Sequence, residues 1–111
     1  MLENLLKMLE RGQDSAMLRF SLGNEYLRRD ALPEAAQHYQ AALELDAQYS
    51  AAWRAYGRTL LRLERLEAAV EALEQGIPVA EARGDKQAAR EMQVFLKRAR
   101  KQLSERDRDK S

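Results

Sequence analysis

Apolar side chains recur at every third or fourth position along nearly the whole chain of 111 residues. This spacing places them on one face of an α-helix, whereas a half-buried strand would need strict alternation. Glycine, proline and short polar groups interrupt the pattern and divide it into helical segments. We therefore predict an all-α protein without strands. Its helices are expected over residues 1–11, 15–29, 33–45, 50–63, 66–83 and 85–103.

Residues that favour helix ends stand at most of these boundaries. Side chains able to cap a helix N-terminus precede three of the segments: Asp14 or Ser15, Ser50, and Asp85. Gly12 and Gly84 follow two of the segments, where glycine favours termination. Pro78 lies inside the fifth segment and predicts a kink or a break in its hydrogen-bond ladder.

The sequence repeats itself after 34 residues, so that Gly23 aligns with Gly57 and Tyr39 with Leu73. Each repeat is predicted to be a helix, a short turn and a second helix. The small glycines allow the paired helices to approach closely, and Tyr39 and Leu73 are predicted to fill the space between them. A unit of this kind cannot bury both of its faces alone, so we expect the units to stack.

The repeated segments carry a family resemblance. LGNEY followed by PEAAQHYQAALELD closely resembles a tetratricopeptide repeat, and WRAYGRTL followed by LEAAVEALEQGI resembles a second one. The chain is thus similar to small single-domain bacterial proteins of the tetratricopeptide repeat family. The resemblance implies a right-handed α-solenoid of two helix pairs, residues 16–49 and 50–83, flanked by an N-terminal helix and a capping helix. The proline that usually closes the repeat is absent, with Ala47 and Glu81 in its place.

The last predicted helix does not continue the repeat, because a further shift of 34 residues puts Glu91 where a glycine is expected. It is predicted instead to be a cap over residues 85–103, with one apolar stripe and with basic residues turned away. The stripe consists of Ala88, Met92, Phe95, Ala99 and Leu103, and the outward basic residues are Arg90, Lys97, Arg98 and Lys101. Residues 1–103 are expected to form a single domain, followed by a disordered charged tail over residues 104–111.

The charges nearly balance, with 19 basic and 18 acidic side chains, and exclude a general affinity for polyanions. Their distribution is uneven, since residues 97–111 carry seven basic and three acidic side chains. The absence of cysteine removes disulfides and thiolate chemistry and favours a cytoplasmic protein. Charged residues interrupt the apolar N-terminus, so neither a signal segment nor a membrane span is expected.

The strongest candidate for a binding site is a basic stripe on the fourth helix. Arg54, Arg58 and Arg62 follow one another at four-residue spacing, whereas Trp53 and Tyr56 lie on the opposite, buried face. In stacked repeats of the family, the first helix of each pair lines the concave surface. The resemblance therefore implies a groove of Met17, Phe20, Asn24, Leu27, Arg28, Ala51, Arg54, Arg58, Leu61 and Arg62. Because arginine forks bind carboxylates, the expected ligand is an acidic peptide segment with a bulky apolar side chain.

Two alternatives concern the same surface. Carboxylates of neighbouring helices can neutralise the arginines and leave a solvated salt-bridge network. The candidates are Glu25, Glu64, Asp85 and Glu91. Some members of the family hold a chaperone's C-terminal carboxylate in a clamp, and Asn24 matches one clamp asparagine. Phe20 and Ala55 stand where such a clamp has a lysine and a second asparagine, so chaperone-tail binding is disfavoured.

Other functions have weaker support. The stretch LKRARKQ over residues 96–102 is a candidate nucleic-acid patch and supplies the alternative function, although no aromatic residue follows Phe95 to stack on bases. The N-terminal LLKML can exchange between two copies, but a monomer is the simpler expectation. The lone His38 and the isolated serines and glycines predict no metal, cofactor or catalytic site. We therefore expect a protein-binding module without enzymatic activity.

Overall fold

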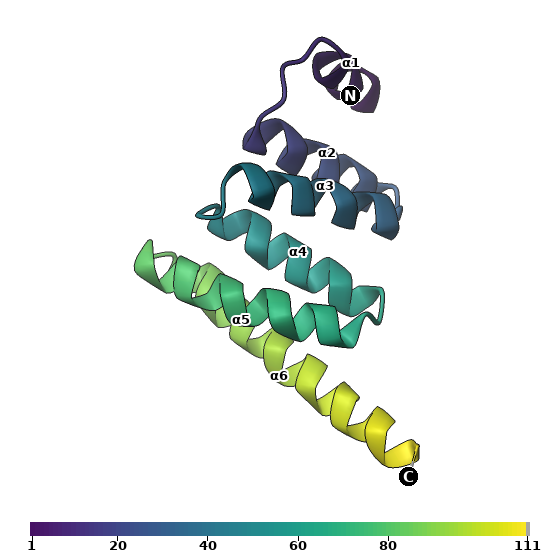
Figure 1. Cartoon of the computed structure of the whole chain (residues 1–111), viewed down its shortest axis with the longest axis vertical. Helices are drawn as coiled ribbons and strands as arrows, with labels where there is room; N and C mark the ends of the chain where they lie inside the picture. Colours follow the sequence, from purple (N-terminus) through teal and green to yellow (C-terminus); the bar gives the residue numbers. More distant parts are fainter. Residues whose placement is uncertain (111) are drawn as a thin grey trace.

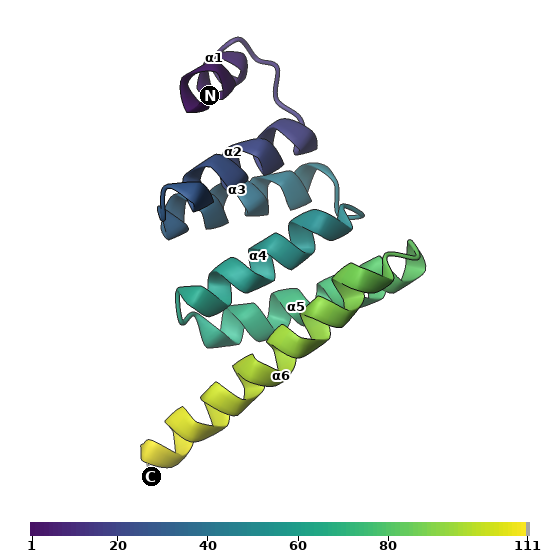
Figure 2. The same cartoon turned by 180° about the vertical axis from the view of Figure 1, so that it is seen from behind.

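The computed structural model describes residues 1–110, which form six α-helices and no strand. The helices are α1 (Leu2–Glu10), α2 (Ala16–Arg28), α3 (Leu32–Leu45), α4 (Ser50–Arg62), α5 (Leu66–Ala82) and α6 (Lys86–Asp109). Two helix pairs, α2 with α3 and α4 with α5, lie side by side, and α6 packs against α5 and α4 (Figure 1 and Figure 2). The prediction of an all-α helical-repeat fold is confirmed.

Two of the three predicted N-terminal caps form. Ser15 Oγ accepts a hydrogen bond from the N–H of Leu18 at 3.0 Å, and Asp85 Oδ1 accepts one from the N–H of Ala88 at 3.1 Å. Ser50 does not cap α4, because it is the first residue of the helix and Tyr49 holds the cap position; its hydroxyl donates instead to Asp85 Oδ2 at 2.7 Å. The expectation for Ser50 was therefore wrong, and folding brings in this carboxylate from 35 residues further along the chain.

Four of the connections between helices place one residue in the left-handed region, at φ of 79° for Gly12, 58° for Asp30, 59° for Glu64 and 74° for Gly84. In each turn, the N–H of the next residue donates to the carbonyl five positions earlier, at 2.8–3.0 Å. This is the Schellman arrangement that closes a helix C-terminus. Glycine adopts the left-handed conformation without steric cost, whereas Asp30 and Glu64 are strained in it. The ends predicted at Gly84 and at Gly12, with φ of 79°, are confirmed.

Replacing Glu64 with glycine is expected to raise the free energy of unfolding by about 0.5–1 kcal/mol. The change relieves the left-handed strain, and Glu64 forms no ion pair with any described residue that would be lost. Urea denaturation followed by circular dichroism measures the gain. Asp30→Gly is the matched comparison and should gain less, because Asp30 also pairs with Arg62 at 3.1 Å. A lower stability of Glu64→Gly would contradict the assignment of strain to this turn.

At Gly23 and Gly57, a large side chain of the paired helix packs directly against the glycine backbone. A Cβ atom on Gly23 would lie 2.5 Å from Cε1 of Tyr39, and one on Gly57 would overlap the side chain of Leu73. Tyr39 and Leu73 are both 0 % exposed. The predicted packing of a large side chain from one helix over a glycine of the other is confirmed in both repeats.

The second repeat is longer than the first, because α5 has 17 residues and α3 has 14. Pro78 lies inside α5 and cannot donate to the carbonyl of Glu74, but the helix continues to Ala82. Because α5 is longer, α6 begins later in the sequence than a third repeat of 34 residues would. A shift of 34 residues therefore does not align α6 with α4. In space, α6 packs on both α5 and α4 (Figure 2).

The C-terminal helix extends further than predicted. α6 ends at Asp109, so the expectation of a disordered tail from residue 104 was wrong for the helical residues 104–109. Ser111 lies outside the described residues. Arg106 pairs with Glu67 in the first turn of α5, and this contact between distant residues supports the extension. The many charges in residues 104–111 predicted disorder, and the sequence did not identify Glu67 as the partner of Arg106.

The first helix is the least buried of the six. α1 lies at the end of the stack opposite to α6 and packs against α2 (Figure 1). None of its residues is buried. Its apolar face is half-buried, through Leu2, Leu5, Leu6 and Leu9.

Candidate functional site

One side of the stack is lined by α2, α4 and α6, with α6 in front of α5 in Figure 2. Two adjoining hollows on this side share Arg58 and Phe95. The first measures about 160 Å³ and is lined by Phe20, Asn24, Leu27, Tyr39, Arg54, Ala55, Arg58, Glu91 and Phe95. The second measures about 360 Å³ and is lined by Arg58, Leu61, Arg62, Glu64, Phe95, Arg98 and Gln102. We refer to the two hollows together as the arginine groove.

Three of the four arginines predicted to line this surface are engaged in ion pairs. The pairs are Arg54 with Glu91 at 3.0 Å, Arg62 with Asp30 at 3.1 Å, and Arg28 with Glu25. The alternative in which carboxylates neutralise the stripe is therefore correct for Glu25 and Glu91. Glu64 and Asp85 form no ion pair with it. Asp30 was not foreseen, because it lies in a turn 32 residues before Arg62.

Arg58 is the exception within the stripe. Its side chain is exposed and forms no ion pair with any of the described residues. Arg98 of α6 lines the same hollow and is likewise exposed and without an ion pair. Two guanidinium groups therefore stand beside Phe95 and Leu61 with their donors free. Their planar fork geometry suits carboxylate ligands.

The remaining predicted residues divide between the groove and its margins. Three of them line the first hollow: Phe20, Asn24 and Leu27. Leu61 lines the second hollow and is 7 % exposed. Ala51 borders a third hollow between α4 and α6, which shares Arg54 and Glu91 with the first. Met17, which is 71 % exposed, and Arg28 line neither hollow of the groove.

Asn24 and Tyr39 form a fixed polar contact in the first hollow. Tyr39 Oη donates to Asn24 Oδ1 at 2.6 Å, and burial raises the pKa of Tyr39 to about 12. The phenol therefore stays protonated and remains the donor at neutral pH. Since its amide oxygen is occupied in this way, Asn24 offers a ligand chiefly its amide N–H groups. The ring of Phe20 packs against Tyr39 with centroids 5.8 Å apart.

Apart from Glu91, which was expected as a counter-charge of the stripe, the contribution of α6 to the groove was not predicted from the sequence. Four residues of α6 line it: Glu91, Phe95, Arg98 and Gln102. The sequence placed Phe95 in the buried stripe and Arg98 on the outward surface. Met92 and Ala99 are buried as predicted, whereas Phe95 is only half-buried. The four residues are spaced so that they share one face of a helix, and this spacing could have indicated a common surface. The sequence did not show that this face lies beside the arginine stripe of α4, because α5 is longer than α3.

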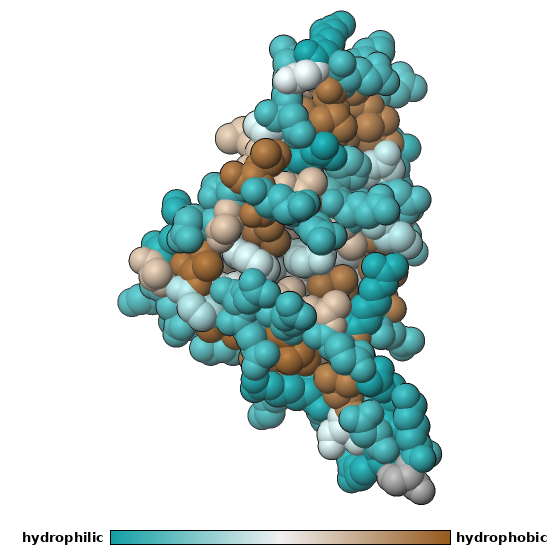
Figure 3. All heavy atoms as spheres, viewed as in Figure 1, coloured by the Kyte–Doolittle hydropathy of each residue, from teal (hydrophilic) through white to brown (hydrophobic). Residues whose placement is uncertain are grey.

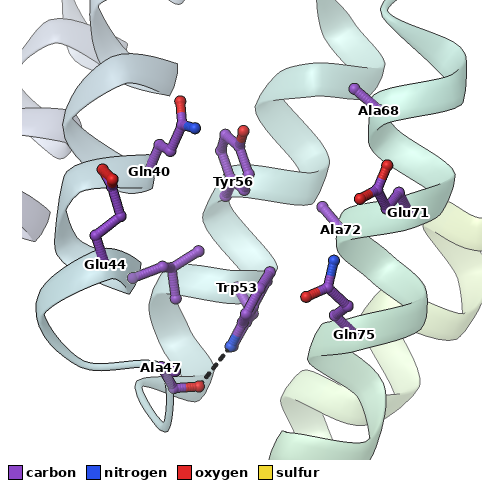
Figure 4. Close-up of a pocket in the computed structure, with 10 residues that line it drawn as sticks. Gln40, Glu44, Ala47, Trp53, Tyr56, Ala68, Glu71, Ala72 and Gln75 are labelled. Atoms are coloured by element: carbon purple, nitrogen blue, oxygen red, sulfur yellow. Dashed lines mark hydrogen bonds between the residues drawn. The ribbon is translucent and has the colours of Figure 1, made fainter.

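Trp53 and Tyr56 lie on the opposite side of the stack, on which α3 and α5 are in front in Figure 1. They are half-buried, whereas the sequence predicted a covered face. Figure 3 shows apolar and weakly polar residues in a band on this side, surrounded by hydrophilic ones. The two rings project from α4 into the gap between α3 and α5 (Figure 4). Small side chains such as Ala68 and Ala72 leave this gap unfilled.

The side chain of His38 contacts Tyr26 and Arg19. Its ring stacks on Tyr26 with centroids 5.3 Å apart, and its Nδ1 lies 3.3 Å from Arg19 Nη1. Burial, and secondarily the charge of Arg19, lower the pKa of His38, so its Nδ1 accepts from the guanidinium at neutral pH. Residues 1–110 contain no group of three His, Cys, Asp or Glu side chains placed to hold a metal ion. None of the six described helices has the length and apolarity needed to cross a membrane.

The stacked helix pairs and the groove define a helical-repeat protein. The tetratricopeptide repeat family model matches residues 26–92 of the chain. A TPR repeat-containing protein from Pseudomonas aeruginosa is 45 % identical over 98 residues, which cover 88 % of this chain and 93 % of that protein. The chain belongs to the tetratricopeptide repeat family. Members of this family are repeat scaffolds that generally mediate protein–protein interactions.

Solved structures show the same architecture. A Bordetella parapertussis protein solved in solution is 39 % identical, with a TM-score of 0.77 over 92 % of this chain and 89 % of that one. A tetratricopeptide repeat domain protein from Salinibacter ruber is 27 % identical, with a TM-score of 0.71 over 78 % and 97 % of the two chains. The TPR2B domain of yeast Sti1, in complex with pHsp70, shares the fold with a TM-score of 0.82 at 18 % identity, over 91 % and 81 % of the chains.

Proposed function

We propose that this protein is a non-catalytic adaptor that binds an acidic segment of a partner protein in the arginine groove. The observation that carries the proposal is a pair of exposed guanidinium groups, Arg58 and Arg98, which lie in a hollow of about 360 Å³ and form no ion pair within residues 1–110. Carboxylates of the partner supply the missing counter-charges. Phe95 and Leu61 contact an apolar side chain of the same segment. In this proposal the protein acts as a monomer in the cytoplasm.

Arg54 and Arg62 have a different role in the proposal. Glu91 and Asp30 already neutralise them, so a ligand carboxylate would have to displace an existing ion pair to reach either guanidinium. These two arginines hold α6 and the α2–α3 turn against α4 and thereby shape the walls of the groove. Direct recognition of carboxylates is assigned to the two arginines without ion pairs.

The basic end of α6 gives the alternative, nucleic-acid binding, less support. Arg100 pairs with Glu74 at 2.7 Å, and Arg106 pairs with Glu67. Phosphate binding depends on clustered cations whose counterions are released, and two cations of this cluster already have carboxylate partners. Nucleic-acid binding is therefore the less favoured function, and the experiment below also tests it.

The test uses an immobilised library of peptides that alternate Asp or Glu with Leu or Phe. Each peptide is paired with a copy in which Asn or Gln replaces the acids. The wild-type protein is expected to retain the acidic peptides, and the Arg58→Glu, Arg98→Glu variant should bind them at least tenfold more weakly, a loss of about 1.4 kcal/mol or more. Neither arginine forms an ion pair with residues 1–110 that would be lost, so circular dichroism should show an unchanged fold.

An Arg29→Glu, Arg90→Glu variant is the matched control, because it makes the same change of charge at two exposed positions outside the groove. It should bind as the wild type does. If both variants lost the same affinity for the acidic peptides, net charge alone would explain the loss, and the arginine groove would not be the binding site. Equal binding of the amide copies would exclude recognition of carboxylates. If the protein bound an RNA oligonucleotide instead of the peptides, and the Lys97→Glu, Lys101→Glu variant lost that binding, nucleic-acid binding would be established as the function.

A further inference from the structure

A second recognition surface lies on the side opposite to the arginine groove. It is a hollow of about 390 Å³ between α3 and α5, with Trp53 and Tyr56 of α4 between its walls (Figure 4). Leu43 and Ala72 add apolar atoms to its lining. We refer to it as the aromatic pocket. The proposed acidic ligand of the arginine groove does not use it.

The aromatic pocket carries two carboxylates without an ion-pair partner among residues 1–110, although the charge of Arg19 acts on Glu44 at longer range. Glu44 of α3 and Glu71 of α5 stand on opposite walls, with the two rings between them (Figure 4). Neither carboxylate forms an ion pair with any of residues 1–110. Burial raises the pKa of the Tyr56 phenol, Glu71 and Glu44 raise it further, and Arg65 opposes them. The rings therefore lie in the field of two carboxylates without direct counter-charges.

The aromatic ring of Trp53 is held in place. Its Nε1 donates to the carbonyl of Ala47 at 2.8 Å. Its Cβ packs so closely on α5 that a Cβ atom added to Gly76 would lie 2.7 Å away. The indole is therefore fixed at both ends and presents a preformed face to a ligand.

We propose that the aromatic pocket binds an arginine side chain, flanked by apolar residues, of a second partner protein. The guanidinium stacks on an aromatic face and donates to Glu44 and Glu71, while Leu43 and Ala72 contact the flanking residues. Arginine is favoured over lysine, because the planar guanidinium both stacks on rings and forks onto carboxylates. Charge complementarity thus identifies the occupant of the pocket.

This inference goes beyond the proposed function, since it concerns another surface and a partner of the opposite charge. The arginine groove offers donors to an acidic segment, and the aromatic pocket offers carboxylates to a basic one. Because the two sites lie on opposite sides of a thin helical stack, both can be occupied at once. The protein then joins two partners.

The pocket contains its own reporter, since Trp53 is the only tryptophan of the chain. The probe is the capped peptide Gly-Leu-Arg-Leu-Gly, compared with the same peptide carrying citrulline, the neutral isostere of arginine. Titration of the full chain by NMR should shift the Trp53 indole N–H and the amides of residues 44 and 71, with a millimolar Kd for so short a peptide. The citrulline peptide should bind at least tenfold more weakly.

Glu44→Gln, Glu71→Gln is expected to weaken binding of the arginine peptide at least tenfold. Glu34→Gln, Glu81→Gln is the matched control, because it removes one exposed charge from each of the same two helices outside the pocket, and it should bind as the wild type does. Arg58→Glu, Arg98→Glu should also bind the arginine peptide normally. A failure of the arginine groove is thereby distinguished from a failure of the aromatic pocket.

Several results would overturn this inference. Equal binding of the citrulline peptide, or an equal loss in the control variant, would exclude recognition by the two carboxylates. Spermidine binding as tightly as the peptide would remove the assignment to a protein partner. A concentration-dependent dimer in sedimentation, abolished by Glu44→Gln, Glu71→Gln, would make the occupant a second copy of the chain.

Discussion

Replacing Tyr39 with alanine is expected to lower the free energy of unfolding by about 3–5 kcal/mol. Tyr39 is 0 % exposed, packs over Gly23 and contacts the ring of Phe20. Truncation leaves a cavity between α2 and α3 and removes the hydrogen bond to Asn24. Since small domains unfold at a cost of only about 5–15 kcal/mol, this single change should bring the protein close to unfolding.

Urea denaturation followed by circular dichroism measures the effect, and Tyr39→Phe is its matched control. Phenylalanine keeps the ring and removes only the hydroxyl that donates to Asn24, so it should cost about 1 kcal/mol. The difference between the two variants isolates the packing of the ring. If both variants lost the same stability, the ring would not contribute to the helix contact, and the description of this interface would be wrong.

Gly57→Val is expected to lower the free energy of unfolding by about 2–3 kcal/mol through overpacking. Even a Cβ atom at this position would overlap the side chain of Leu73, which is 0 % exposed and packed within a core cluster. Valine has a higher helix propensity than glycine, so the loss can only come from the contact between α4 and α5. The same urea denaturation measures it.

A double-mutant cycle tests the cause of this effect. Leu73→Ala alone should cost about 2–5 kcal/mol, but combined with Gly57→Val it leaves space for the added side chain. The double variant should therefore be more stable than the sum of the single changes, by about 0.5–3 kcal/mol. Ala68→Val, on the exposed part of α5, is the control and should change stability by less than about 0.5 kcal/mol. Strictly additive losses would contradict a close approach of the two helices at Gly57.

The repeat architecture could be predicted because each helix pair solves the same packing problem with residues at the same positions. Gly23 and Gly57 make room for Tyr39 and Leu73, and this requirement leaves a pattern with a period of 34 residues in the sequence. The helix ends were equally accessible. Ser15, Asp85 and Gly84 act on backbone groups a few residues away, so their effect depends on local sequence.

The candidate site was predicted only in part. Sequence periodicity placed the arginine stripe of α4 away from Trp53 and Tyr56, and the groove does run along that side. It could not tell which arginines remain without partners, because Arg54 pairs with a glutamate 37 residues away. It also could not place Phe95 and Arg98 in the groove, since three additional residues in α5 change the register of α6.

The sequence by itself thus determined the helices, most of their ends and their pairing, because these depend on local contacts or on contacts that recur at fixed spacing. Only the tertiary structure decided the rest. It neutralised Arg54 and Arg62, left Arg58 beside Arg98, and opened the aromatic pocket between α3 and α5. The physical reason is that a hydrophobic pattern specifies which faces are buried, whereas the reach of one charged side chain to another is set by how the helices stack.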